Sequence, residues 1–170
     1  MPASNKIDLA RLSLSSGEGR RVDLELDPGT LTYGGQTYAT SHADPGQVEV
    51  SRMSSGYAFR LRFDTDLRGP CMRCLADASV PIAVDAREVD QGGDDEDLHS
   101  PYVDGEELRV GAWAHDALAL ALPAQLLCRP DCAGLCPVCG ESLNDAEPGA
   151  HDHESAPDPR WAKLRELNLD

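Results

Sequence analysis

Apolar and polar side chains alternate through the middle of the chain. Between residues 57 and 63 every second side chain is large and apolar, and the positions between them include Arg60 and Arg62. Because successive side chains of a strand point to opposite faces, this pattern predicts a strand with one buried face and one wet, basic face. Similar alternation precedes it at residues 48–50 and follows it at residues 80–89. The three segments predict an antiparallel meander.

The N-terminal part shows the same alternation over shorter lengths. Residues 7–9 and 22–26 alternate as half-buried strands do, which predicts short edge strands. Gly, Pro and Asp then mark three turns, at Asp27-Pro28-Gly29, Gly34-Gly35 and Asp44-Pro45-Gly46. No long helix is therefore expected in this part of the chain.

Two later segments carry helix signals. Residues 111–122 are rich in strong helix formers and stop before Pro123, so they form the best predicted helix. His115 lies within it and is expected to be packed or solvated, since no second histidine sits one turn away. Asp158 followed by Pro159 reads as an N-cap with Pro at the first helical position, which predicts a short C-terminal helix.

Charge and composition narrow the class of protein. The 170 residues carry a net charge of −15, which argues against a general nucleic-acid binder, because phosphate contacts need Lys and Arg. Residues 90–107 are expected to form a mobile acidic loop, and its Asp94–Asp97 run is either a solvated segment or an attraction for a basic partner. No apolar run is long enough to span a bilayer, and residues 1–14 lack the order of a secretion signal. We expect a soluble cytoplasmic protein with no membrane partner.

Six cysteines supply the candidate chemistry. Cys136-Pro137-Val138-Cys139-Gly140 has the spacing of a zinc knuckle, in which Pro and Gly shape a turn that points backbone N–H groups at the sulfurs. This spacing favours metal binding over disulfides. The favoured ligand set for Zn²⁺ is local and needs no tertiary rearrangement: Cys128, Cys132, Cys136 and Cys139.

Two other ligand sets compete. A second C-x2-C pair, Cys71 and Cys74, lies between two predicted strands and could join Cys136 and Cys139, at the cost of closing a long loop. Alternatively these two cysteines are simply reduced or buried in a loop. The third set joins Cys136 and Cys139 to His151 and His153, although the histidine segment also fits a disordered acidic linker.

Every set is closed by four protein ligands, so we expect a structural metal, with one or two ions bound. No catalytic constellation stands out in the sequence, and we expect a protein that is not an enzyme. The predicted fold is α+β: an antiparallel β-sheet meander with a central helix, a C-terminal cysteine-rich zinc-knuckle segment and a short terminal helix. Its predicted divisions are residues 1–125 for the body with its N-terminal strands, 126–157 for the knuckle segment and linker, and 158–170 for the terminal helix.

A set of motifs taken together resembles a known family. They are Cys71-Met72-Arg73-Cys74-Leu75 after a strand, an acidic middle, a helix ending in Leu122-Pro123, Leu127-Cys128, Cys132 to Gly140, Leu143-Asn144 and Asp158-Pro159-Arg160. They resemble the YceD family, whose members are described as large ribosomal RNA subunit accumulation proteins. Family members often carry C-x-C where this chain has His151-Asp152-His153. Because His can replace Cys as a zinc ligand, this departure favours metal binding by the histidines.

The resemblance implies a bacterial or plastid cytosolic protein needed for accumulation of large-subunit ribosomal RNA. We expect a non-enzymatic ribosome biogenesis factor that binds this RNA or a basic ribosomal protein, with Arg60, Arg62, Arg68 and Arg73 as candidate contacts. The arginines on the strand could equally serve only to keep its outer face soluble. The alternative function is a cytosolic zinc or thiol-redox protein that uses Cys71 and Cys74.

Overall fold

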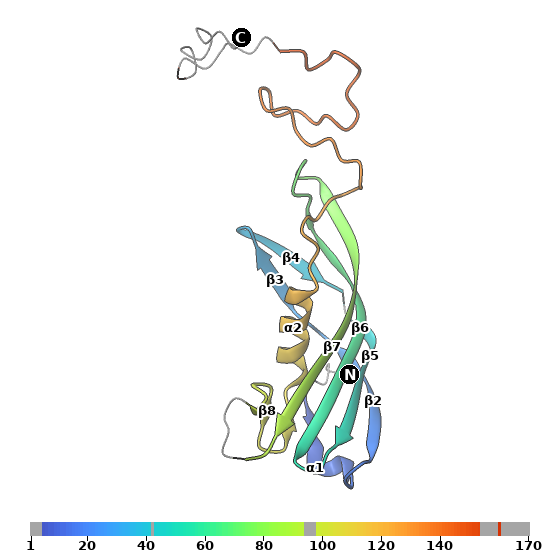
Figure 1. Ribbon diagram of the computed structural model, residues 1–170. Coiled ribbons are helices and arrows are strands. Elements are labelled where there is room, and N and C mark those ends of the chain that lie inside the picture. The colour runs from blue at the N-terminus through green and yellow to red at the C-terminus, as the bar shows by residue number, and fades with distance from the viewer. Residues whose placement is uncertain (1–4, 42, 94–97, 154–159, 161–170) are drawn as a thin grey trace, which may run out of the picture.

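A six-stranded antiparallel sheet forms the body of the protein (Figure 1). The computed structural model describes residues 5–41, 43–93, 98–153 and 160. The strands of this sheet are β2 (Gly19–Leu26), β3 (Thr30–Tyr33), β4 (Gln36–Thr40), β5 (Ala43–Arg52), β6 (Gly56–Pro70) and β7 (Asp77–Gln91). Their order is β2-β5-β6-β4-β3, with β7 paired to β6 along its whole length. The predicted meander of residues 48–50, 57–63 and 80–89 is therefore confirmed as β5, β6 and β7.

The longest feature is the hairpin of β6 and β7. Each strand has 15 residues, and their pairing runs without a break from Gly56–Gln91 to Pro70–Asp77. The tip of this hairpin lies well beyond α2 (Val110–Leu120), and the chain that follows α2 runs up beside it (Figure 1). The hairpin thus carries the first cysteine pair toward the cysteine-rich C-terminal segment.

The hydrophobic core lies between the inner face of the sheet and α2. Leu61 of β6 is fully buried, Phe59 is 3% exposed, and the ring of Phe59 meets Trp113 of α2 edge to face at 6.3 Å. The predicted helix of residues 111–122 is observed at Val110–Leu120, two residues shorter at its C-terminal end. His115, which was expected to be packed or solvated, is half-buried, and its Nδ1 lies 3.0 Å from the carbonyl oxygen of Pro28.

One predicted turn is wrong. Residues 44–46 belong to β5, and a register irregularity there leaves Leu24 opposite Gly46 and Leu26 opposite Ala43. Pairing of β5 with β6 begins only at Gln47. Pro45 has no backbone N–H, but no carbonyl of β6 is paired with β5 at this point. The proline is therefore tolerated here, as it is in an edge strand.

The predicted acidic loop of residues 90–107 is also partly wrong. β7 continues to Gln91, and β8 (Val103–Asp104) and β9 (Glu107–Leu108) form a small hairpin. β1 (Ile7–Asp8) completes this three-stranded sheet, and Leu9 begins the short helix α1 (Leu9–Leu12). Leu108 of β9 is fully buried in the core, which anchors this small sheet.

Two other expectations fall outside the described residues, namely the 94–97 run and, apart from residue 160, the helix predicted at 158–170. The division of the chain at residues 125 and 157 stays a prediction. The coarse fold prediction is confirmed, because the structure is mostly antiparallel sheet with few helices and cysteine clusters toward the C-terminal end.

Candidate metal centre

The tip of the β6–β7 hairpin is a cysteine-bearing turn. The N–H of Cys71 donates to the carbonyl of Ala76 at 2.7 Å, and the N–H of Leu75 donates to the carbonyl of Cys71 at 3.0 Å. The N–H of Arg73 points at the sulfur of Cys71 at 3.5 Å. Leu75 adopts a left-handed φ of 60° to close the turn. This backbone presents the thiols of Cys71 and Cys74 on one side.

The segment after α2 supplies two more thiols beside this tip. The N–H of Met72 donates to the carbonyl of Leu126 at 2.9 Å, and the guanidinium of Arg73 donates to the carbonyl of Cys132 at 2.9 Å. These bonds anchor residues 126–132 along the turn. The two segments would thus be held in register by the protein itself, which organises a ligand set in advance.

Four cysteines meet where the two segments touch. Cys71 Sγ lies 3.8 Å from Cys132 Sγ, and Cys74 Sγ lies 3.6 Å from Cys128 Sγ. All four sulfurs lie within 4.8 Å of one another. Four sulfurs bound to one zinc ion at about 2.3 Å in a tetrahedron would be about 3.8 Å apart, so the spacing fits this ion. We call Cys71, Cys74, Cys128 and Cys132 the hairpin-tip cluster.

The acidity of the thiols is uneven across the hairpin-tip cluster. Burial raises the pKa of Cys71, but the backbone N–H groups of Cys74, Arg73 and Cys128 lower it, and its pKa falls to about 6. For Cys128, burial and the neighbouring thiols raise the pKa to about 12. Thiolates crowded together repel one another, and a divalent cation would offset that repulsion. The cluster therefore suits a metal in its chemistry as well as its spacing.

The structure groups the eight candidate ligands differently from the favoured prediction. Cys128 and Cys132 do not lie with Cys136 and Cys139 but with the cysteines of the hairpin tip. Cys136 and Cys139 instead lie with His151 and His153, which was the third predicted set. We call these four the C-terminal cluster. The set that joined both C-x2-C pairs is likewise not assembled, and metal binding itself stays a prediction.

The four candidate contact arginines are placed on or above the outer face of the hairpin. Arg60 forms a two-bond ion pair with Asp85 of β7, at 2.9 and 2.6 Å, and Arg62 is paired with Glu49 of β5. Hydrogen bonding by Arg60 lowers the pKa of Asp85. Arg68 is more exposed and lies 3.9 Å from Asp66, while Arg73 sits at the hairpin-tip cluster. The face at Arg60 and Arg62 is thus charge-compensated rather than basic.

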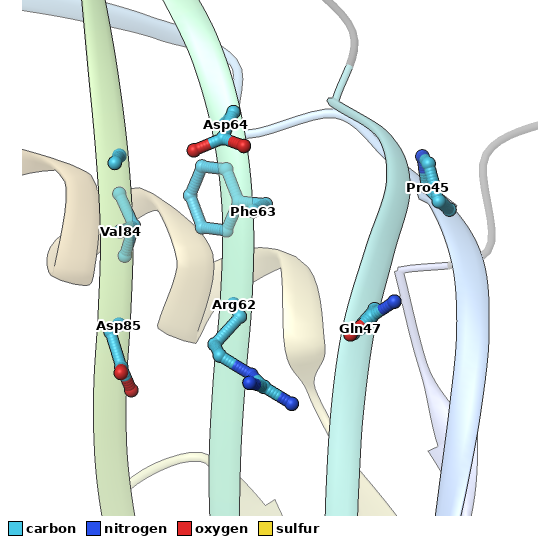
Figure 2. Close-up of a pocket in the computed structure, with 8 residues that line it drawn as sticks. Pro45, Gln47, Arg62, Phe63, Asp64, Val84 and Asp85 are labelled. Atoms are coloured by element: carbon cyan, nitrogen blue, oxygen red, sulfur yellow. The ribbon is translucent and has the colours of Figure 1, made fainter.

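A hollow of about 460 Å³ opens on this outer face where β5 and β6 separate (Figure 2). Arg62 extends from β6 toward β5 at its edge, and Asp64 and Asp85 also line it. Because Arg62 is already paired with Glu49 and two carboxylates line the hollow, we assign no anion site to it.

The chain is similar to a known family and to several individual proteins. A family profile described as "Large ribosomal RNA subunit accumulation protein YceD" matches residues 59–168. An uncharacterized protein of Mycobacterium tuberculosis is 42% identical over 106 residues, which are 58% of this chain and 49% of that protein. An uncharacterized protein of Mycobacterium leprae is 35% identical over 104 residues, 57% of this chain and 46% of that protein.

A maize protein is similar over a shorter region. It is named large ribosomal RNA subunit accumulation protein YCED homolog 1, chloroplastic, and is 37% identical over 81 residues, 48% of this chain and 24% of that protein. The chain spans about half the length of the mycobacterial relatives it matches, and less of the maize protein. No solved structure matches it. Within residues 5–41, 43–93 and 98–153, no helix has the length and apolarity needed to cross a membrane.

Proposed function

The chain belongs to the YceD family of large ribosomal RNA subunit accumulation proteins, and on that premise we propose that it is a non-enzymatic, cytoplasmic ribosome biogenesis factor. It supports accumulation or processing of large-subunit ribosomal RNA by binding this RNA or a ribosomal protein. The observation that carries the proposal is the extent of the family match, since residues 59–168 cover all but the first three residues of the β6–β7 hairpin and include the cysteine segment beside its tip.

The cofactor in this proposal is Zn²⁺ held by the hairpin-tip cluster. Four thiolates fill a tetrahedral zinc site and leave no position for a reacting water, which is the pattern of structural zinc. The ion would tie residues 71–74 to residues 128–132, far apart in the chain. Its role is to fix the shape of the hairpin tip, which agrees with a protein that binds rather than catalyses.

A basic ribosomal protein is the direct partner that the charges favour. The chain carries a net charge of −15, so its long-range field attracts cations and repels phosphate. Arg60 and Arg62, which lie at alternate positions of β6, are already paired with Asp85 and Glu49. Direct contact with RNA through Arg68 and Arg73 is the alternative.

The test is complementation of a strain that lacks the gene. The measured quantity is the ratio of large-subunit to small-subunit ribosomal RNA, and the wild-type chain is expected to restore it. The C71S/C132S variant is expected to fail, because it removes two ligands of the hairpin-tip cluster. Full complementation by this variant would show that the metal is not needed for the function. An unchanged ratio of the two ribosomal RNAs in the deletion strain would contradict the ribosomal role.

Nuclease treatment separates the two partner classes. Association of the tagged chain with pre-ribosomal material that survives ribonuclease supports a ribosomal protein, whereas association that is lost supports RNA. The thiol-redox alternative is tested on the same preparation, because a Cys71–Cys74 pair that cycles as a disulfide would show a reduction potential near that of the cytosol once metal is removed.

A further inference from the structure

The two C-x2-C turns of the chain share one backbone design. In the first, the N–H of Cys71 donates to the carbonyl five residues ahead and the N–H of Leu75 donates back to the carbonyl of Cys71. In the second, the N–H of Cys136 donates to the carbonyl of Glu141 at 2.8 Å, and the N–H of Gly140 donates to the carbonyl of Cys136 at 2.9 Å. The bonds join the same relative positions in both turns. The second turn is thus built as the first one is.

The closing residue of each turn has the same conformation. Leu75 and Gly140 each follow the second cysteine, and both have positive φ, 60° and 76°. In the second turn the N–H groups of Cys139 and Val138 lower the pKa of Cys136, as the N–H groups at the corresponding positions do for Cys71. Two turns with one geometry present two thiols in the same way, so each offers a pair of ligands to a metal.

The other half of the second site comes from a histidine-bearing turn. His151 and His153 alternate around Asp152, and the Nδ1 of His151 lies 3.3 Å from the sulfur of Cys139. All four ligand atoms of the C-terminal cluster lie within 4.8 Å of one another. A sulfur and a nitrogen bound to one tetrahedral zinc ion at about 2.3 and 2.1 Å would lie about 3.6 Å apart, which is close to the observed spacing.

The two clusters differ in how far they are buried. In the hairpin-tip cluster Cys71 and Cys132 are 0% and 1% exposed. In the C-terminal cluster Cys139 and His153 are exposed, and only Cys136 is buried. Solvent and chelators therefore reach the second set of ligands more readily than the first.

We infer that Cys136, Cys139, His151 and His153 form a second, separate zinc site, and that its ion exchanges with solution more readily than the ion of the hairpin-tip cluster. The inference concerns metal binding alone and does not depend on the ribosomal role, so either can fail while the other stands. As a consequence, the histidine segment is released from Cys136 and Cys139 when zinc is scarce and is held to them again when zinc is abundant. The hairpin-tip cluster keeps its ion under both conditions.

The experiment measures zinc in the purified full-length chain and its release. Elemental analysis is expected to find two zinc ions per chain, and a chelator in excess is expected to remove one equivalent in a fast phase and the other in a slow phase. The H151A/H153A variant is expected to hold one ion and to lose the fast phase only. A single ion in the wild-type chain, or two ions in this variant, would overturn the inference.

Two further variants distinguish the loss of metal ligands from misfolding of the protein. H151C/H153C preserves four ligands and is expected to hold two ions, and after Co²⁺ substitution its thiolate-to-metal absorption should rise relative to wild type. C71S/C74S is expected to lose the slow phase and keep the fast one. Loss of both ions together in either the histidine or the Cys71 variant would show a shared site and contradict the separation.

Discussion

The sulfurs of Cys71 and Cys132 lie 3.8 Å apart although 61 positions separate the two residues in the chain. This contact joins the tip of the β6–β7 hairpin to the segment that follows α2, and the bonds from Met72 and Arg73 run alongside it. A metal at this place would thus couple the order of the hairpin tip to that of the C-terminal segment.

Replacing one ligand of the hairpin-tip cluster should therefore destabilise the metal-loaded protein. We expect C132S to lose one zinc equivalent and to unfold at a lower temperature, since a ligand present at a thousand times its Kd contributes about 4 kcal/mol to stability. Thermal unfolding with and without chelator, together with zinc analysis, measures both effects. The matched variant C139S should retain the ion of the hairpin-tip cluster, and an unchanged zinc content in C132S would argue against that cluster.

The backbone at Leu75 leads to a stabilising substitution. A left-handed φ costs an ordinary residue about 1 kcal/mol or more relative to Gly, and Leu75 is 58% exposed, so little burial is lost. We expect L75G to raise the free energy of unfolding by about 1 kcal/mol in urea titrations of the metal-loaded protein. V138G is the control, because Val138 is also exposed but lacks the positive φ, and this variant should be destabilised. Equal effects of the two substitutions would contradict the argument.

Close packing at Gly56 predicts the opposite outcome. A Cβ on Gly56 would lie 1.9 Å from the carbonyl oxygen of Asp90 across the hairpin, so the two strands would have to separate. We expect G56A to cost about 1–3 kcal/mol of stability, as overpacking does. At Gly92 the nearest atom would lie 3.6 Å away, and G92A should be close to neutral. Chemical denaturation of both variants checks this, and a neutral G56A would mean that the start of β6 is not held as described.

The pair of Arg60 and Asp85 allows its structural role to be separated from a role in binding. Because both side chains are partly exposed and solvent screens the pair, R60D alone should lower the stability only slightly. The swap R60D/D85R should recover most of this loss and should support ribosomal RNA accumulation like the wild type. If the swap restores stability but not accumulation, Arg60 contacts a partner directly.

Tyr102 provides a prediction about pH. Burial and the hydrogen bond from its hydroxyl to Asp116 raise its pKa to about 12. Because the raised pKa favours the neutral phenol in the folded state, its contribution to stability is fully present below pH 10 and is lost as the pH rises toward 12. Ultraviolet titration should show one tyrosine ionising late, and D116N should bring that step to lower pH. A late step that persists in Y102F would assign it to another tyrosine.

The sheet could be predicted from the sequence, because its signal is local. Phe59 and Leu61 are buried and Arg60 lies on the opposite face, as strand alternation requires. The continuation of β5 through Pro45 was missed, since turn-forming residues were weighed without knowing that the β6 side of the strand is unpaired there. The residues next to Pro45 in the sequence do not indicate which strands pair with it in the sheet.

The grouping of the cysteines was missed for a different reason. Proximity in sequence favoured Cys128 with Cys136, and closure of a long loop was treated as costly. The entropy of closing a loop grows only with the logarithm of its length, at about 0.6 kcal/mol for each doubling. A hairpin of two 15-residue strands that is already paired along its length then carries Cys71 to Cys132 with little further cost. All eight candidate ligands lie in one of the two clusters, but in a different grouping from the favoured one.

The division of the hairpin-tip cluster between two distant segments also orders events during translation. Cys71 and Cys74 leave the ribosome more than 50 residues ahead of Cys128 and Cys132, so the hairpin can pair while only half of its ligand set exists. A nascent chain arrested before Cys128 presents an open two-thiol tip. Closure of this site therefore reports that synthesis has passed the segment after α2.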